Sequence, residues 1–172
     1  MRHTASVSLS ESELAVAKLP APLASKLVSL VAELRRLDRL VVAFSGGADS
    51  AFLAAVATRT LGAERVHAVT AVSPSLAGDE EAACHSLATE WALRWTPVST
   101  DEMERAAYRL NDTDRCYHCK AELMDVVRPI ALAERATIVL GVNTDDLGDH
   151  RPGQRAAIEA GASFPLVTAG FT

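Results

Sequence analysis

The sequence has 172 residues, about the length of one domain, and its 49% apolar and 23% charged residues are typical of a globular protein with a buried core. The formal net charge is −5 and no run of five like charges occurs, which argues against a general nucleic-acid-binding surface but is compatible with a small phosphate ligand. No apolar stretch is long enough for a membrane span or a secretory signal, so we expect a cytoplasmic protein without a membrane or nucleic-acid partner.

The first elements predicted along the chain are helical. Ser10 and Glu13 fit a capping box ahead of a short helix. One face of a longer helix is then marked by apolar residues at helical spacing, namely Leu23, Leu27, Leu30, Val31, Leu34 and Leu37. We therefore expect residues 1–38 to form a helical lead-in to a single domain spanning residues 39–172.

Strand and helix patterns alternate along the rest of the chain. We predict strands at 40–44, 65–72, 94–98 and 137–142, and helices at 50–61, 79–93, 102–109 and 116–134. Pro129 is expected to kink or divide the last of these helices. This alternation predicts right-handed βαβ units, and hence an α/β fold with a parallel sheet covered by helices on both faces.

The junction after the first strand reads Ser45-Gly46-Gly47-Ala48-Asp49-Ser50. Ligands of open α/β sheets bind at the carboxyl ends of strands, where free amides at a helix N-terminus attract phosphate. Two glycines permit a close approach of successive N–H groups to an oxyanion. Ser45 and Ser50 add hydroxyl donors, and Asp49 is a candidate helix cap or Mg²⁺ partner. A turn that only caps the helix, without a ligand, is the alternative interpretation.

The sequence has three cysteines, two of them in the pair Cys116 and Cys119. An odd number of cysteines cannot all form disulfides within one chain, and the expected cytoplasmic compartment is reducing. This favours metal or redox chemistry over a disulfide framework. A pair of buried thiols is one alternative, and half a zinc site completed by His118 or His85 is another. Cys84 falls inside a predicted helix, and we expect it to be a buried helix residue.

The segment 141–166, GVNTDDLGDHRPGQRAAIEAGASFPL, follows the last predicted strand. Gly141 and Asn143 are expected to end that strand on the ligand-binding side of the sheet. Carboxylates in such a loop suit Mg²⁺, and the planar fork of arginine suits a phosphorylated or carboxylated substrate. The residues of these types are Asp145, Asp146, Asp149, Arg151 and Arg155. A solvated turn with Pro152 at the start of a helix is the alternative.

The Ser-Gly-Gly-x-Asp-Ser loop resembles the PP-loop of the N-type ATP pyrophosphatases. Together with RCYHCK at 115–120 and NTDDLGDHRPG at 143–153, it gives the chain a close resemblance to the LarE family from about residue 22 to its end. Members of that family are ATP-dependent sacrificial sulfur transferases that help to build the nickel-pincer nucleotide cofactor of lactate racemase. The resemblance implies a Rossmann-like PP-loop domain of the adenine-nucleotide alpha hydrolase type.

The resemblance also implies a reaction. A carboxylate of pyridinium-3,5-biscarboxylic acid mononucleotide is adenylated, pyrophosphate is released, and the carboxylate becomes a thiocarboxylate. The sulfur comes from a protein cysteine or, in members that carry the CxxC pair, from a 4Fe–4S cluster. Cys116 and Cys119 match that pair, so the cluster route is expected here.

The site residues and partners follow from the same resemblance. ATP is expected to bind at Ser45, Gly46, Gly47, Asp49, Ser50, Ala71, Gly141 and Asn143. Catalytic roles are implied for Asp49, Asp146 and Arg151, with Asp49 also holding Mg²⁺. The expected partners are the small nucleotide substrate, the other enzymes of nickel-pincer cofactor assembly and a second copy of the chain.

The family's third functional cysteine belongs to a segment later than Thr172, so we expect the C-terminal sulfur-transfer region to be absent from this chain. Two other functions remain open. One is tRNA thiolation by a PP-loop protein, which the acidic balance and the lack of a basic stripe disfavour. The other is a nucleotide-binding or cluster-carrying module without catalysis of its own.

Overall fold

The computed structural model describes residues 19–72, 78–99, 115–148 and 152–172. The capping box at Ser10 and Glu13, the predicted helix at 102–109, and the predicted site residue Arg151 lie outside these residues. So does Asp149 of the acidic segment.

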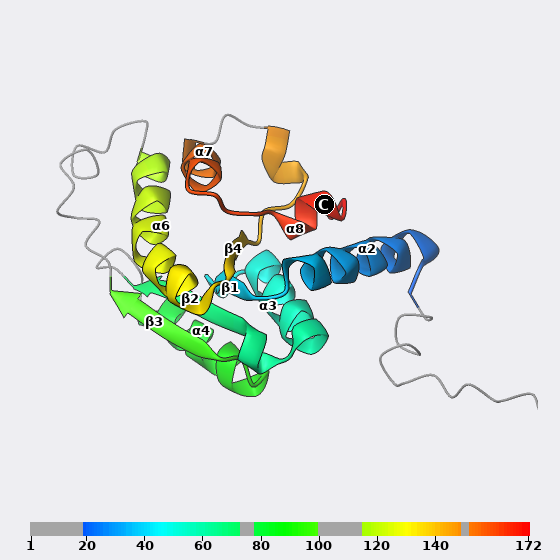
Figure 1. Ribbon diagram of the computed structural model, residues 1–172, viewed down its shortest axis with the longest axis horizontal. Coiled ribbons are helices and arrows are strands. Elements are labelled where there is room, and N and C mark those ends of the chain that lie inside the picture. Colours follow the sequence, from blue (N-terminus) through cyan, green and yellow to red (C-terminus); the bar gives the residue numbers. More distant parts are fainter. Residues whose placement is uncertain (1–18, 73–77, 100–114, 149–151) are drawn as a thin grey trace, which may run out of the picture.

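Four parallel strands form one sheet in the spatial order β3-β2-β1-β4 (Figure 1). Leu40 lies opposite Val66 on one side and opposite Thr137 on the other, so β1 is an interior strand. The strands are β1 (Leu40–Ala43), β2 (Val66–Val72), β3 (Trp95–Ser99) and β4 (Thr137–Leu140). The predicted α/β fold with a parallel sheet is confirmed.

Helices cover both faces of this sheet (Figure 1). One face packs against α2 (Ala21–Leu37), α3 (Ala48–Leu61), α4 (Gly78–Glu90) and α8 (Pro165–Thr168). The other face packs against α6 (Arg115–Glu134) and α7 (Pro152–Glu159). Short 3-10 turns, η1 (Ala63–Arg65) and η3 (Asp145–Gly148), precede β2 and follow β4.

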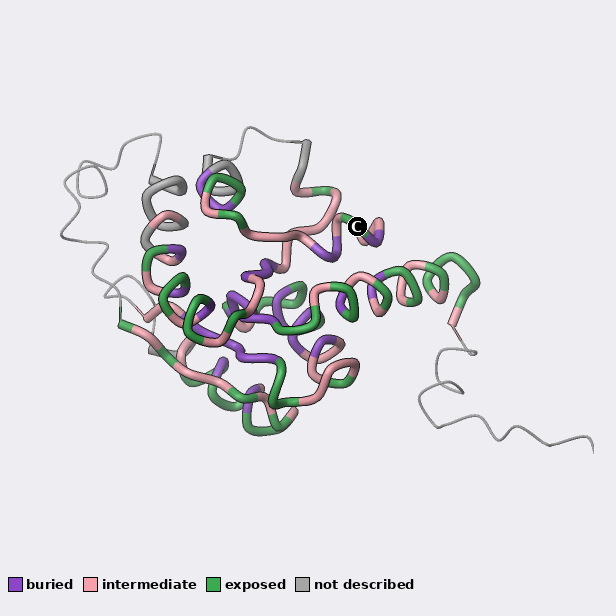
Figure 2. Tube along the Cα trace, in the orientation of Figure 1, coloured by how far each residue is buried: buried purple, intermediate pink, exposed green. Residues whose placement is uncertain are grey.

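The alternation of side chains along β1 builds two hydrophobic clusters. Val42 faces α2 and α3, where it packs with residues such as Leu34 and Leu53. Val41 faces α6, where it packs with residues such as Val127. Because both faces are buried, β1 is a continuous apolar run, which Figure 2 shows as an unbroken purple trace at the centre of the fold.

Several element boundaries differ from those predicted. The helix predicted at 79–93 ends at Glu90, because Ala92 adopts a left-handed conformation with φ 52° and the N–H of Leu93 returns to the carbonyl of Ala88. The helix predicted from residue 50 already begins at Ala48. Pro129 lies inside α6 without dividing it, on an exposed position where water can satisfy the carbonyl that loses its donor.

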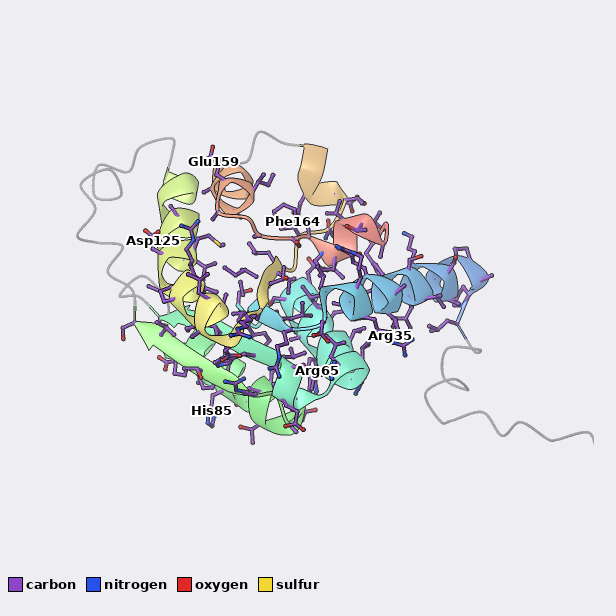
Figure 3. All side chains as sticks on the ribbon, in the orientation of Figure 1. Arg35, Arg65, His85, Asp125, Glu159 and Phe164 are labelled. Atoms are coloured by element: carbon purple, nitrogen blue, oxygen red, sulfur yellow. The ribbon has the colours of Figure 1, made fainter. Side chains whose placement is uncertain are left out.

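A single extended residue lengthens the sheet beyond β4. Ser163 N donates to the carbonyl of Ile138 (2.9 Å) and Ser163 O accepts from Leu140 N (3.1 Å), which forms a parallel bridge. Phe164 follows directly before α8, between α7 and α8 in Figure 3, and packs against the cluster that contains Ile138 and Leu140 of β4. The segment between α7 and α8 therefore covers the outer edge of β4.

At the amino end of the strands, a polar network fastens α6 to the sheet. His67 of β2 is buried, and its Nδ1 lies 2.9 Å from Glu134 Oε1 while its Nε2 lies 2.8 Å from Thr96 Oγ1. Since a carboxylate only accepts, Nδ1–H donates to Glu134. Arg94 adds two hydrogen bonds to the same carboxylate, at 2.6 and 2.9 Å. The network joins β2, β3 and the last turn of α6.

In the described part of the chain, no helix combines the length and the apolar character that crossing a membrane requires. Charged side chains such as Asp125 of α6 and Glu159 of α7 are exposed, and Figure 3 shows them on the outside of the helical layer.

Candidate functional site

A cavity of about 250 Å³ opens at the carboxyl ends of β1, β2 and β4. The strands that neighbour β1 belong to different crossovers, because the chain adds β2 on one side and returns with β4 on the other. Such a switch point is where open α/β sheets bind ligands. The cavity is lined by residues 43–45, 47–50, 69–71 and 140–142 and by Leu123 of α6.

The glycine pair in the loop after β1 has two separate structural roles. Gly46 has φ +73°, a conformation that L side chains rarely adopt, and a Cβ there would come within 2.9 Å of Cys84 Sγ. Gly47 has φ −68° at the N-cap of α3, and a Cβ there would meet nothing closer than Ser45 Oγ at 3.5 Å. The fold therefore requires glycine at 46, whereas glycine at 47 leaves open space beside the cavity.

Ser50 braces the loop from inside. Its buried hydroxyl donates to the Gly47 carbonyl (3.0 Å), accepts from Ser45 N (3.2 Å) and lies 3.1 Å from Ser45 Oγ. Because a hydroxyl has one proton, the Ser45 hydroxyl is the donor in the contact between the two serines. Ser50 therefore holds the loop in shape, and Ser45 is the exposed serine at the cavity.

Gly141 lets the end of β4 lie directly against the start of α3. A Cβ at this position would fall 2.6 Å from Ser50 N and 2.8 Å from the Asp49 carbonyl carbon. Both neighbours are backbone atoms, which cannot turn aside as a flexible side chain can. Only glycine fits this contact, so Gly141 brings the second wall of the cavity up to the loop.

Asn143 joins the two walls by hydrogen bonds. Its Nδ2 donates to Asp49 Oδ2 at 3.2 Å, and its Oδ1 accepts from the backbone N–H groups of Asp145 (2.9 Å) and Asp146 (3.2 Å). Asp146 Oδ2 in turn accepts from Asn143 N at 3.2 Å. The structure thus brings Asp49, Asn143 and Asp146, three of the predicted site residues, together, and η3 begins from this contact.

A buried threonine that the sequence analysis did not single out supports the loop from behind. Thr70 Oγ1 donates to the carbonyl of Phe44 (2.7 Å) and accepts from Trp95 Nε1 (2.8 Å). The contact fixes the last carbonyl before the loop begins. A polar residue near the carboxyl end of the predicted strand 65–72 was the available signal. Ala71, predicted to contact ATP, follows Thr70 and lines the cavity.

The cysteine pair lies on the first turns of α6, at the same end of the sheet as the cavity. Residues 116 and 119 are seven and four positions before Leu123, so all three share one face of the helix. The side chains of Cys116, Cys119 and Arg155 lie outside the described part of the structure. Cys84, in contrast, is buried in α4 as expected.

Among the side chains that the structure describes, no three His, Cys, Asp or Glu residues converge as a metal site. Mg²⁺ in nucleotide sites is commonly held by one or two carboxylates together with the phosphates of the substrate. Asp49 offers such a carboxylate, exposed at the cavity and in the first turn of α3. The donor set therefore suits a cation that arrives with a nucleotide.

The sequence profile of the NAD synthase family matches residues 23–134. Among curated proteins, the chain is 45% identical over 145 residues to an uncharacterized protein of Synechocystis sp., covering 84% of this chain and 54% of that protein. The chain is also 36% identical over 152 residues to the pyridinium-3,5-bisthiocarboxylic acid mononucleotide synthase of Lactiplantibacillus plantarum, a LarE protein. That match covers 88% of this chain and 55% of the synthase. The chain spans about half the length of the curated relatives it matches.

Solved structures show the same fold at low sequence identity. The glutamine-dependent NAD⁺ synthetase of Acinetobacter baumannii, in complex with ADP, superposes with a TM-score of 0.62 at 15% identity over 73% of this chain and 26% of that one. The NMN synthetase of Francisella tularensis superposes with a TM-score of 0.58 at 17% identity over 73% and 56%. The resemblance to LarE and the PP-loop fold expected from the sequence are confirmed.

Proposed function

The chain belongs to the NAD synthase family of PP-loop proteins, and from this premise we propose that it binds ATP in the cavity and adenylates a carboxylate of pyridinium-3,5-biscarboxylic acid mononucleotide. The activated carboxylate would then receive sulfur. The curated relative from Lactiplantibacillus plantarum supports this choice of substrate, because its name describes a synthase of the corresponding bisthiocarboxylic acid mononucleotide.

The observation that carries the proposal is the open backbone at Gly47. The N-terminus of α3 faces the cavity, and its first amides have no partners within the helix. The absence of a side chain at Gly47 leaves room for a phosphate to approach these N–H groups. Amides at a helix N-terminus also carry the positive end of the helix dipole, which favours an anionic ligand.

The first chemical step would form an acyl adenylate. A carboxylate oxygen of the substrate attacks the α-phosphorus of ATP, a new P–O bond forms, and the bond to the bridging oxygen breaks. Pyrophosphate leaves with that electron pair. Loop amides that hold the leaving phosphates would stabilise the charge that develops on them.

The second step explains the need for the first. An oxygen of a free carboxylate is a poor leaving group, whereas AMP is a good one. Attack of a sulfur nucleophile on the carbonyl carbon therefore displaces AMP and leaves a thiocarboxylate. Gly141 and Val142 line the cavity on the β4 side, where we place the carboxylate substrate, and Asn143 and Asp146 follow directly behind them. Arg151 is proposed to bind its phosphate or second carboxylate.

Two cofactors belong to this proposal. Asp49 would hold Mg²⁺, which would offset the negative charge of the triphosphate beside that carboxylate. Cys116 and Cys119 would supply two thiolate ligands to a 4Fe–4S cluster, which would supply the sulfur. Their positions on the α6 face that carries Leu123 support this assignment, because Leu123 lines the cavity. A second copy of the chain and the other enzymes of nickel-pincer cofactor assembly are the proposed protein partners.

Pyrophosphate release tests the proposal directly. Purified protein with Mg²⁺ and ATP should release pyrophosphate when the pyridinium biscarboxylate mononucleotide is added, and only at background level without it. AMP should appear in equal amount once the acyl adenylate is cleaved. Gly47→Val is the matched control, because it fills the space beside the α3 amides without changing charge.

The same assay separates the alternatives. Pyrophosphate release that requires tRNA in place of the pyridinium nucleotide would replace the proposed substrate by an RNA. Binding of ATP without pyrophosphate release under any of these conditions would contradict an adenylating enzyme and favour a nucleotide-binding module.

A further inference from the structure

We propose that Asn143 is a positioning residue that holds the Asp49 carboxylate at the cavity and acts on the nucleotide only through Asp49. The inference rests on the proposed function, and it replaces the direct ATP contact that the family resemblance implies for Asn143. Asp49 lines the cavity, whereas Asn143 stands behind it and does not. The two side chains meet across the junction between the loop after β1 and the segment after β4.

The hydrogen-bonding capacity of Asn143 is nearly exhausted inside the protein. Both lone pairs of Oδ1 are used by the N–H groups of Asp145 and Asp146, at 2.9 and 3.2 Å. One proton of Nδ2 goes to Asp49 Oδ2 at 3.2 Å. An asparagine amide has two acceptor sites and two donor protons, so a single N–H remains. Direct contact with a nucleotide could therefore use no more than this one hydrogen bond, whereas three hydrogen bonds hold the amide inside the protein.

The orientation of this amide is set by its partners. Rotating it by half a turn would bring Nδ2 against two N–H groups and Oδ1 against the Asp49 carboxylate, so that three hydrogen bonds would become three repulsions. The backbone N–H groups of η3 therefore force Nδ2 toward Asp49. In this way the turn after β4 determines where the carboxylate on α3 lies.

Such a contact matters because Asp49 is exposed. An exposed aspartate samples several rotamers, and binding a cation with it must first select one of them. A donor on a well-anchored neighbour makes that selection before the ligand arrives. We therefore expect the loss of this donor to weaken the binding of ATP with Mg²⁺ more than the binding of ATP alone.

One substitution removes the hydrogen bond to Asp49 and keeps the hydrogen bonds to the backbone amides of η3. Asn143→Asp keeps an acceptor for the Asp145 and Asp146 amides but replaces the donor facing Asp49 by a second carboxylate. The exchanged pair Asp49→Asn with Asn143→Asp restores one donor and one acceptor. Thr144→Asp is the matched control, because it adds the same charge one residue along the chain and leaves Asn143 in place.

The test is a double-mutant cycle on the 172-residue chain, read by titration calorimetry with ATP and Mg²⁺. Asn143→Asp should weaken binding about tenfold, as expected for a lost hydrogen bond to a charged group. In the Asp49→Asn background, the same substitution should change the affinity by less than about twofold. An equal loss in both backgrounds would show that Asn143 acts on the nucleotide directly, and would overturn the inference.

A second measurement, thermal unfolding, tests the same contact without a nucleotide. In the ligand-free protein, Asn143→Asp should lower the melting temperature by about 3 °C, and the exchanged pair should recover most of that loss. Additive effects would show that the two side chains do not interact, and would overturn the inference even if ATP binds. Failure of the unmodified chain to bind ATP with Mg²⁺ would instead contradict the proposed function, while the thermal cycle still reports on the contact.

Discussion

The backbone of Gly141 lies so close to Ser50 that a Cβ on the glycine would fall 2.6 Å from the Ser50 nitrogen. The contact brings the end of β4 against the first turn of α3, and both sides of it border the cavity. Packing inside the fold and the shape of the candidate ATP site therefore depend on the same pair of residues.

Gly141→Ala should damage both properties together. The added methyl would meet three backbone atoms of Asp49 and Ser50 closer than 3.0 Å, so either β4 or α3 must move. We expect a loss of roughly 2 kcal/mol or more in the free energy of unfolding, measured by urea denaturation, with ATP binding lost in parallel. Unchanged stability would mean that the two elements are not in contact in solution.

Gly47→Ala should have the opposite profile. Its φ of −68° suits alanine, and a Cβ there has room, so stability should stay within about 0.5 kcal/mol of the unmodified protein. ATP affinity should nevertheless fall, and Gly47→Val should lower it by about tenfold or more, or about 1.4 kcal/mol. Calorimetry that shows full ATP affinity in the valine variant would remove this loop from the binding site.

Cys84 should influence the nucleotide although it is buried away from the cavity. Its Sγ lies beneath Gly46, at the place that a Cβ on that glycine would need. Cys84→Val adds a second γ-atom under the loop and should weaken ATP binding by about fivefold, within the range of an overpacking cost of about 1 kcal/mol.

Ala88→Val is the control for this prediction, because Ala88 is buried one turn later on the same helix. It should destabilise the protein by a similar amount without changing ATP affinity. If both variants lower the affinity equally, the effect of Cys84 comes from general destabilisation and not from the loop.

The stability of the protein should decrease at acid pH through Glu134. Burial raises the pKa of this carboxyl, but the hydrogen bonds from Arg94 and His67 outweigh burial, so its pKa lies below the ordinary value of 4.5. A group with a lowered folded-state pKa stabilises the fold above its unfolded pKa, and that contribution disappears as the pH falls through the folded value.

Thermal unfolding from pH ~7 to pH ~3 measures this contribution. Glu134→Gln should unfold at a lower temperature at neutral pH, by the equivalent of about 1.5 kcal/mol, and the difference should become smaller toward the acid end of the series. Glu33→Gln is the comparison variant. The pKa of Glu33 is also lowered, but by a hydrogen bond from the exposed Arg36 on the same helix and not by a network between α6 and the sheet. A difference of the same size at every pH in the series would show that charge is not the cause.

The cysteine pair should bind iron independently of ATP. After anaerobic reconstitution, the 172-residue chain should show only a weak brown charge-transfer absorption of an iron–sulfur cluster, because two thiolates leave two irons without protein ligands, and Cys116→Ala or Cys119→Ala should abolish it. ATP binding should stay nearly unchanged in both variants, since the proposed phosphate contacts come from the loop after β1. Cys84→Ser should keep the iron. Zinc at one equivalent, with no iron, would contradict the cluster assignment.

The central elements could be predicted from sequence because each depends on local chemistry. The run 40–44, made mostly of β-branched and aromatic residues ahead of two glycines, predicts a buried strand, and the observed β1 matches that prediction to within one residue. Helix ends were less predictable. Leu93 continues the apolar spacing of the helix, but in the structure it lies in a turn after the helix end at Glu90 and packs against the core from there. Nothing nearby in the sequence distinguishes a longer helix from a helix followed by a turn.

The parts of the site that were missed depend on pairs that are distant in sequence. Thr70 beneath Phe44, and Cys84 beneath Gly46, follow from the register of β2 and the docking of α4. Asn143 was expected at the site, but its contact with Asp49 spans 94 positions along the chain. A sequence pattern identifies which residue types gather at a sheet edge, whereas the sharing of their donors and acceptors is decided by tertiary packing.

The spatial order of the strands has a consequence for how the protein is made. Of the four strands that the structure describes, β1 leaves the ribosome first, and one of its two neighbours, β4, leaves after the other three. A nascent chain can pair β1 with β2 early, through a local crossover, but the wall that ends in Gly141 arrives only when synthesis has reached β4. Local contacts form fastest, and those of large sequence separation form late. The loop after β1 therefore exists for part of each synthesis as half of the candidate site, and a nucleotide that touches both walls would favour the four-stranded sheet over its precursor.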